Sequence, residues 1–539
     1  MKKYIYIFGA IALVIILPIA FKRTNLALPK YADDTLVIIT PHPESIRTEM
    51  DLGFREWYYK KTGRTVKIDW RITGSTGEVI RYIDSIYINA FQLYWENTLH
   101  EVWDQEVQKN FINLNPKGER AKKIREAFLN SNVSCGIDLL FGGGVVEHKK
   151  EADMGQLVPS DLIQKHPEWF CDNCIPAQLS GDNLYDPNGV WYGTSLASFG
   201  IIYNTDRVAD LKLPHAPSQW IDLISPKLYH QIAMVDPVQS SIVIKCLEMM
   251  IQQQMKFVRS DILTQTKQTD LTKDQLQYVL NKGWINGLKM IQKIMANSRY
   301  FTDNSVTTVW DVAMGNCSVG IVVDFYGRHQ REDTRARSGS DRFHIILPKG
   351  GTTLSPDPIS MFRGAKHKDV AEAFMEYVLS KEGQERIGFK TGTPNGPQYY
   401  ALHRTPLRKD FYVEENKKFM STPEMNPFLE EDEFPYQYSW TGTAFSAIRI
   451  LSKVLFMDPF TELSKAWKAI IDAQAEGRMA QAESALAVME DLNDITYDWV
   501  FSTLIPNSKN PLQKISLETE LTKKFRQKYI QAYQIATQK

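Results

Sequence analysis

Short runs of aliphatic and β-branched residues, each ending in a glycine-rich or polar loop, recur along this 539-residue chain. Residues 35–40 and 65–70 are two such runs, and the second breaks at Gly74-Ser75-Thr76-Gly77 before a helical pattern begins. Residues 137–141 repeat the order and reach Gly142-Gly143-Gly144. Repeated strand, loop and helix are typical of an α/β fold with a parallel sheet. In such sheets ligands bind over the loops at the carboxyl ends of the strands.

A second region with the same order begins after residues 200–204. It contains strand-like runs at 231–235 and 320–324, and the first of these leads into Asp236-Pro237-Val238-Gln239-Ser240-Ser241 and a helix. The sequence therefore predicts two α/β units, without internal repeats or low-complexity segments.

The pattern changes at about residue 405, beyond which only helices are predicted. The last helix carries an apolar stripe at four-residue spacing, formed by Leu517, Leu521, Phe525 and Tyr529. This stripe is expected to pack on the rest of the molecule. Residues 434–441 are rich in aromatics, which are expected to attach the helices to the neighbouring lobe or, alternatively, to form a surface on which a partner docks. The last helix also carries a basic face that is expected to be exposed to solvent or, alternatively, to contact anionic lipid. Its residues are Lys523, Lys524, Arg526 and Lys528.

The charge balance excludes one class of partner. The chain has 63 Lys and Arg and 63 Asp and Glu, so its formal net charge is zero. Proteins that bind nucleic acid through a general positive field carry an excess of basic residues. No nucleic-acid partner is expected, and any preference for anions must come from helix N-termini and hydroxyl groups at the binding site itself.

An uncharged apolar run of 18 residues, Tyr4 to Phe21, is bracketed by Lys2 and Lys3 before it and by Lys22 and Arg23 after it. Its length reaches the lower limit for crossing a bilayer. The residues around Pro18 and Ala20 make a poor cleavage signal. Residues 1–34 are therefore expected to be an export signal, either a cleaved peptide or, as we favour, an uncleaved membrane anchor.

Five cysteines are too few for a disulfide scaffold in a chain of this length. Cys171 and Cys174 flank two residues and leave three alternatives open: a local disulfide, half of a zinc site, or two thiols. Cys135, Cys246 and Cys317 lie in apolar contexts and are expected to be buried thiols.

Motifs of several enzyme classes are missing from the sequence. It has no P-loop, no His-Glu-x-x-His motif and no Gly-x-Ser-x-Gly motif. A non-enzymatic protein without a cofactor is expected, and an enzyme on this scaffold is the least favoured alternative.

Two polar loops could hold an anion. Gly74-Ser75-Thr76-Gly77-Glu78 offers backbone N–H groups, two hydroxyls and the positive end of a helix dipole, which suit a phosphate or carboxylate. The loop at 236–241 repeats this arrangement with Ser240 and Ser241. Either loop could instead be an ordinary helix cap. Several such loops in two α/β units fit one shared crevice.

These segments resemble the extracellular solute-binding proteins of ABC transporters over roughly residues 35–400. The residues that carry the resemblance are Leu36-Val37-Ile38-Ile39-Thr40, Gly193-Thr194-Ser195, Gly200-Ile201-Ile202-Tyr203-Asn204-Thr205, Pro217 to Leu223, Ala233 to Pro237, Ala371 to Phe374 and Leu379 to Gln384. The branch that binds ferric iron or phosphorylated solutes is the most similar.

The resemblance implies a two-lobed α/β fold of the type II periplasmic-binding-protein kind, with an all-helical C-terminal extension and an N-terminal hydrophobic helix. Residues 35–203 would form the first part of lobe 1, 204–335 lobe 2, 336–404 the return of lobe 1, and 405–539 the extension. The crossings between lobes are expected near 195–203 and 342–348. The lobes would close on the solute by a hinge motion.

The resemblance also implies a monomer in the periplasm or cell envelope that delivers a small anionic solute to an ABC permease in the cytoplasmic membrane. An organophosphate, a sugar phosphate and a carboxylate are the candidate solutes. An extracytoplasmic ligand sensor is the alternative function. The expected ligand-binding residues are Thr40, His42, Glu44, Gly74, Ser75, Thr76, Gly143, Gly144, Ser195, Ser198, Asp236, Gln239, Ser240, Ser241, Asp324, Tyr326 and Arg328.

Ferric iron is the alternative cargo. Related iron-binding proteins use two adjacent tyrosines at the end of the strand that here leads into Phe325-Tyr326, and Phe325 cannot supply a phenolate. No metal is therefore expected, although Tyr326 and His42 would be the ligands if iron were bound. Arg328 is instead a candidate counter-charge for an anion.

Overall fold

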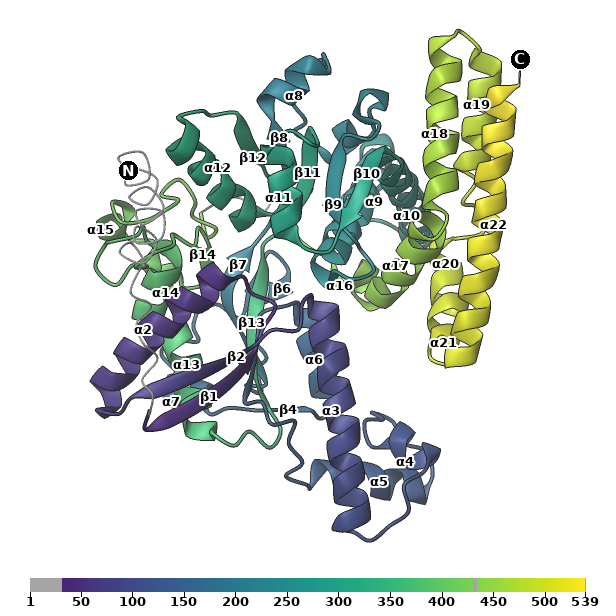
Figure 1. The fold of residues 1–539 in the computed structure, drawn as a ribbon. Helices are drawn as coiled ribbons and strands as arrows, with labels where there is room; N and C mark the ends of the chain where they lie inside the picture. The colour runs from purple at the N-terminus through teal and green to yellow at the C-terminus, as the bar shows by residue number, and fades with distance from the viewer. Residues whose placement is uncertain (1–31, 430–433, 539) are drawn as a thin grey trace, which may run out of the picture.

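The computed structural model describes residues 32–429 and 434–538. Two β-sheets covered by helices form two lobes, and a helical C-terminal extension stands beside the second of them (Figure 1). The predicted two-lobed α/β architecture with a helical extension is confirmed. The predicted export signal or anchor at Tyr4 to Phe21 lies outside the described residues. Within the described ranges, no helix is long and apolar enough to cross a membrane.

Lobe 1 is built on a seven-stranded sheet. Its strands, in spatial order, are β14 (Thr405–Pro406), β7 (Trp191–Ala197), β13 (Ser355–Phe362), β3 (Leu139–Phe141), β1 (Asp34–Ile39) and β2 (Val66–Arg71), with β4 (Leu157–Val158) paired to β13. Strands β1, β2 and β3 are parallel, so their carboxyl ends share one edge. From that edge the chain enters α2 (Glu44–Thr62), α3 (Thr76–Asn97) and α6 (Val145–Asp153).

The other helices of lobe 1 cover the sheet or project from it. They are α4 (Gln105–Asn110), α5 (Glu119–Leu129), α7 (Leu162–Lys165), α13 (Lys368–Leu379), α14 (Lys381–Gly388) and α15 (Glu414–Lys417). A short hairpin, β5 (Gln178–Leu179) and β6 (Asp182–Asn183), also belongs to this part of the chain.

Lobe 2 is built on a five-stranded sheet with the order β10 (Ser298–Thr302), β9 (Ile232–Val235), β11 (Val319–Val323), β8 (Phe199–Asn204) and β12 (Phe343–Ile346). The parallel strands β9 and β11 lead into the helices that begin nearest to lobe 1. The helices of this lobe are α8 (Thr205–Asp210), α9 (Ser241–Thr266), α10 (Lys273–Asn297), α11 (Ser305–Ala313) and α12 (Asp324–Ser338).

The first crossing lies within the predicted range 195–203, but the predicted domain boundaries differ from the structure. The chain passes from β7 to β8 through Ser198, so that 199–203 lie in lobe 2 instead of lobe 1. It returns between β12 and β13, so the predicted boundary at 335/336 falls inside α12. Strand β14 pairs with β7 and keeps the start of the predicted extension in lobe 1. Apolar runs predict strands, but the sheet that each strand joins depends on its partners.

The extension packs on lobe 2. Its helices are α16 (Tyr438–Thr441), α17 (Phe445–Leu451), α18 (Phe460–Ala475), α19 (Met479–Met489), α20 (Tyr497–Trp499), α21 (Ile505–Ser508) and α22 (Pro511–Thr537). Figure 1 shows α18, α19 and α22 as a bundle beside α10. Leu521, Phe525 and Tyr529 are buried in it, which confirms the packing predicted from the apolar stripe of α22.

Candidate functional site

A cavity of about 130 Å³ lies between the lobes. Three helices begin at it, because each follows a strand whose carboxyl end faces the other lobe. The residues that line it from these helix starts are Gly144, Val145 and Val146 at α6, Ser241 and Ile242 at α9, and Phe325 and Tyr326 at α12. First-turn N–H groups of a helix have no partner within the helix, and the helix dipole makes this end positive. The cavity therefore receives three positive helix ends.

The local sequence explains how two of these helices start at the cavity. Gly143 has φ +100° and leads into Gly144, the residue before the first turn of α6. A Cβ at Gly143 would lie 3.0 Å from Cγ2 of Thr76 in the neighbouring loop. The Ser240 hydroxyl accepts a hydrogen bond from the Val243 N–H and so caps α9.

Lys149, on the second turn of α6, is a cation at the wall of this cavity. Its ammonium lies 5.8 Å from the ring centre of Trp191 and 5.3 Å from that of Tyr438. Burial lowers the pKa of Lys149. Among the described residues no carboxylate lies within ion-pairing distance of it. Its charge is therefore available to an anion in the cavity.

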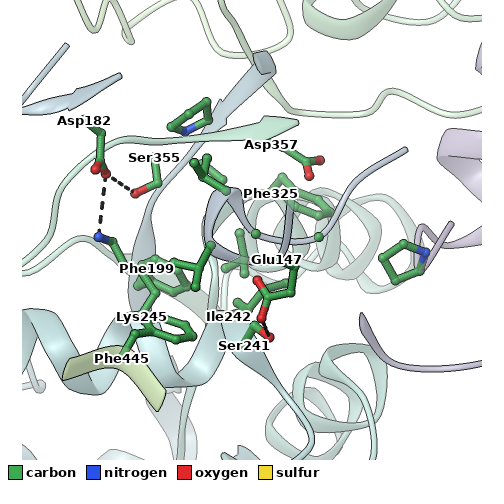
Figure 2. Close-up of a pocket in the computed structure, with 18 of the residues that line it drawn as sticks. Glu147, Asp182, Phe199, Ser241, Ile242, Lys245, Phe325, Ser355, Asp357 and Phe445 are labelled. Atoms are coloured by element: carbon green, nitrogen blue, oxygen red, sulfur yellow. Dashed lines mark hydrogen bonds and ion pairs between the residues drawn. The ribbon is translucent and has the colours of Figure 1, made fainter. Parts of the chain in front are cut away.

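Lys245, on α9, is a second cation at the wall, but it is already paired. Its ammonium lies 3.7 Å from Asp182 and 3.3 Å from Glu248. It also lies 3.2 Å from the ring centre of Tyr436. Figure 2 shows Lys245 and Ser355 both joined to Asp182. Lys245 therefore joins the two lobes as well as lining the cavity.

His42, Asp357 and Arg404 form a buried cluster at the cavity. Nε2 of His42 lies 2.7 Å from the Asp357 carboxylate and 3.2 Å from Nη1 of Arg404. Nη2 of Arg404 donates a hydrogen bond to the same carboxylate. Burial alone would raise the pKa of Asp357, but Arg404 and His42 outweigh it and hold that pKa well below its usual range. Burial lowers the pKa of His42, although the neighbouring Asp357 opposes this shift.

Glu147, also on α6, presents a carboxylate with one oxygen in use and one free. Its Oε1 accepts hydrogen bonds from the Ser241 hydroxyl and, at 3.3 Å, from Nη2 of Arg449. Its Oε2 is buried and has no hydrogen-bond partner within the described ranges. An acceptor of this kind at a cavity wall suits a donor group on a bound molecule.

Five of the predicted residues line the cavity: His42, Gly143, Gly144, Ser241 and Tyr326. They come from both lobes, so the structure brings residues of the two predicted α/β units to one cavity. The other twelve predicted residues do not line it.

The predicted loops at 74–77 and 236–240 meet each other instead of forming the wall. Ser75 caps α3 in a capping box with Glu78, and Arg81 of α3 donates to the Gln239 side chain at 3.3 Å. A Cβ at Gly77 would lie 3.2 Å from the Gln239 carbonyl oxygen. These loops, with Gly74, Thr76, Asp236 and Ser240, therefore form a contact between the lobes beside the cavity.

The remaining predicted residues have structural roles or lie elsewhere. Arg328 lies 2.8 Å from Asp324 in an ion pair within α12, so it is not a free counter-charge. Thr40 accepts from the His42 N–H, and Ser198 donates to the Thr353 carbonyl oxygen at the crossing between lobes. Ser195 is buried in β7 and Glu44 is exposed at the start of α2.

Several wall residues were not predicted from the sequence. Lys149 follows the glycine-rich loop by little more than one turn, a position that could have revealed it. Asp357 and Arg404 meet His42 only through the pairing of β13, β7 and β14. Tyr436 and Phe445 come from the extension, and no local pattern connects them to the lobes.

The arrangement offers little to a metal ion. In the part of the chain that the structure describes, no three His, Cys, Asp or Glu side chains form a cluster that could hold one. Burial raises the pKa of Tyr326 to about 12. Cys171 is exposed, and Cys174, Cys135, Cys246 and Cys317 are buried. All five are free thiols, so the alternative of a local disulfide is not realised.

Comparison with known proteins gives one family. A family model described as bacterial extracellular solute-binding protein matches residues 132–401. An uncharacterized protein of Haemophilus influenzae is 24% identical over 324 residues, which are 60% of this chain and 79% of that protein.

Solved structures with low sequence identity are also similar. The periplasmic binding protein AfuA from Actinobacillus pleuropneumoniae, with fructose-6-phosphate bound, is 17% identical and has a TM-score of 0.45, over 70% of this chain and 86% of that one. The apo ferric ion-binding protein A of Pasteurella haemolytica is 14% identical, with a TM-score of 0.46, over 78% and 96%.

Proposed function

Because the chain belongs to the bacterial extracellular solute-binding proteins, we propose that it is the substrate-binding component of an ABC importer. It captures a small anionic solute between its two lobes, in the periplasm or cell envelope, and delivers it to a permease in the cytoplasmic membrane. The N-terminal apolar run would export the body of the protein or anchor it to that membrane.

One observation carries the choice of an anion. The N-termini of α6, α9 and α12 converge on the cavity that also holds the ammonium of Lys149, which has no carboxylate partner among the residues that the structure describes. Helix N-termini bind phosphate and carboxylate groups through their free N–H groups and their dipole. A neutral solute would leave the Lys149 charge uncompensated in a half-buried site.

The carboxylates narrow the class of solute. Glu147 and Asp182 line the same cavity as Lys149, and Oε2 of Glu147 lacks a donor. An anion that also carries hydroxyl groups, such as a sugar phosphate or a hydroxycarboxylate, satisfies both the cation and this acceptor. A bare divalent anion has no hydrogen-bond donor to offer to Oε2 of Glu147.

Ferric iron remains the alternative cargo, with less support. Its two candidate ligands, His42 and Tyr326, both line the cavity. His42 already contacts Asp357 and Arg404, and the positive charge of Arg404 opposes the binding of a trivalent cation. A visible tyrosinate-to-iron band after addition of ferric citrate, removed by Tyr326→Phe, would support iron instead.

Calorimetric titration of the purified protein tests the anion proposal. Glucose 6-phosphate and glucose form a matched pair that differs in the phosphate, and citrate and inorganic phosphate complete the set. We expect at least one anion to bind and glucose not to bind. Lys149→Ala should raise the Kd of that anion about tenfold or more, since a hydrogen bond to a charged group contributes roughly 1.5–3 kcal/mol.

The control is Lys123→Ala, which removes an exposed lysine of α5 in the same lobe. It should leave the Kd unchanged. Binding of glucose but of no anion, or equal affinity of the wild type and Lys149→Ala for the bound anion, would contradict the proposal.

A further inference from the structure

The C-terminal extension reaches into the cavity between the lobes. Tyr436 and Phe445 line the cavity together with residues of lobe 1 and lobe 2. Residues 434–451, called the bridging segment below, include α16 and α17 and lie between α9 of lobe 2 and α6 of lobe 1 (Figure 1). The cavity therefore has three walls, one of which comes from neither lobe.

The bridging segment is fixed to lobe 2 by a buried polar network on α9. Glu248, fully buried, accepts hydrogen bonds from the hydroxyls of Tyr436 and Thr441, both at 2.6 Å. Gln252, also fully buried, donates to Thr441 and to the Gln437 carbonyl oxygen, and accepts from the Gln437 N–H at 3.0 Å. Breaking such a network would leave buried polar groups unpaired, so this attachment is permanent.

Its contacts with lobe 1 are fewer and more exposed. The Tyr436 N–H donates to the Ser180 carbonyl oxygen at 2.9 Å in the β5–β6 hairpin. Lys149 lies over the ring of Tyr438, and Arg449 pairs with Glu147 at 3.3 Å. Tyr438 is 48% exposed, and the Arg449 side chain is 32% exposed. These are contacts that can break while the segment stays on lobe 2.

Arg449 also connects this segment to the cavity wall. Its Nη2 donates to the Ser241 hydroxyl at 2.7 Å, and that hydroxyl bonds Glu147. Ser241 begins α9 and Glu147 lies in the first turn of α6, so one guanidinium holds together two of the helix starts that line the cavity. Separation of the lobes must break at least one of these bonds.

We propose that the bridging segment is part of the solute site, in which it forms the third wall and holds lobe 1 against lobe 2 before a solute binds. The segment supplies the specificity-determining side chains Tyr436 and Phe445, and its contacts with Lys149 and Glu147 set how far the lobes open. The inference rests on the proposed function, because it concerns closure of the same cavity.

Distance measurement between the lobes, without any solute, tests this proposal. Cys171 is an exposed thiol of lobe 1, and Thr264→Cys adds an exposed one near the end of α9. Spin labels at both positions report the distance between the lobes by pulsed electron resonance. In this labelled background the double variant Tyr438→Ala/Arg449→Ala removes the contacts of the bridging segment with Lys149 and Glu147 and leaves the Glu248 and Gln252 network in place.

The otherwise unmodified labelled protein should show one short distance. The double variant should gain a population at longer distance, and Arg259→Ala, which removes an exposed arginine of α9, should not. Because Tyr438 and Arg449 are partly exposed, the double variant should keep the thermal unfolding midpoint within a few degrees.

Identical distance distributions in the labelled protein and the double variant would overturn the proposal, as would long distances in both. Neither result depends on the identity of the solute, because no solute is present. A failure of anion binding in the titration would leave this distance measurement intact, so the two proposals can fail separately.

Discussion

At the scale of single residues, the site depends on buried groups that satisfy one another. His42, Asp357 and Arg404 come from three distant parts of the chain and meet at the cavity. Removing one partner of such a set leaves the others buried and unpaired, which usually costs several kcal/mol. The cluster therefore fixes the geometry of the wall, and Lys149, which lacks such a partner in the described ranges, is left for the solute.

His148 gives a prediction about pH. It is fully buried on α6, with Nδ1 2.8 Å from the Ser360 hydroxyl and Nε2 3.1 Å from the Gly142 carbonyl oxygen. Burial lowers its pKa to about 4, from 6.5 in the unfolded chain. The unfolded state therefore binds more protons between these values, and the contribution of neutral His148 to stability is lost as the pH falls below 6.5.

Urea unfolding of the wild type and His148→Gln at pH 7 and pH 4.5 measures this contribution. The wild type should be the more stable at pH 7, and its advantage should shrink by about 2–3 kcal/mol at pH 4.5. Other titrating groups are common to both proteins and cancel in the difference. An advantage that stays constant with pH would contradict the assignment of His148 as a neutral buried ring.

At the scale of elements, α9 combines three tasks. Its start lines the cavity, its middle holds the bridging segment through Glu248 and Gln252, and its far side packs on α10. The two helices approach closely at Gly283, where a Cβ would lie 2.4 Å from Cα of Met255. Only glycine permits this backbone contact.

Gly283→Ala should therefore destabilise the protein. In an ordinary helix this change stabilises by about 1 kcal/mol, but here the added methyl group meets backbone, and overpacking typically costs about 1–3 kcal/mol. Chemical unfolding checks the sign, with Ser260→Ala on the exposed face of α9 as the control, expected within about 0.5 kcal/mol of the wild type. A more stable Gly283→Ala variant would show that α9 and α10 are not in close contact.

The helices and strands show how much of the fold and of the site could be predicted from the sequence alone. Strand, loop and helix order predicted most strands and the helix starts after 144 and 240, because these depend on local patterns. Asp324 was instead predicted as the last residue of a strand, and it begins α12. His42 was found through the resemblance to a known family, and Ser241 was found because it ends a polar loop that opens a helix. Asp357, Arg404 and the wall from Tyr436 and Phe445 were missed, because pairing between distant strands and the path of the extension leave no local signal.

At the scale of the whole molecule, the extension is firmly packed on lobe 2. Trp284 of α10 is fully buried and its ring packs against Tyr497 at 5.8 Å. Gln292 donates to the Met489 carbonyl oxygen and the Tyr529 hydroxyl, and Trp467 donates to Asn297 at 2.7 Å. An interface with buried aromatic and polar groups of this kind is not a transient contact.

Ending the chain after Leu429 should therefore disrupt more than the binding site. The truncated protein would expose Trp284 and leave the Gln292 side-chain amide and Oδ1 of Asn297 without their partners, so we expect aggregation or loss of the single cooperative transition. Gel filtration and thermal unfolding monitored by near-ultraviolet circular dichroism check this against the full chain. A monomer that melts cooperatively at the midpoint of the full chain would show that the extension is independent of lobe 2.

The path of the chain gives the bridging segment one more property. Phe411 and Met420 pack in lobe 1, and Lys256 of α9 in lobe 2 lies over the ring of Phe434, so the backbone joins the lobes a third time beyond the two crossings between the sheets. A group tethered on both sides meets its partners at an effective concentration that reaches the millimolar range for short connections. Contacts too weak to hold two separate molecules together can therefore govern how far the two lobes open before a solute binds.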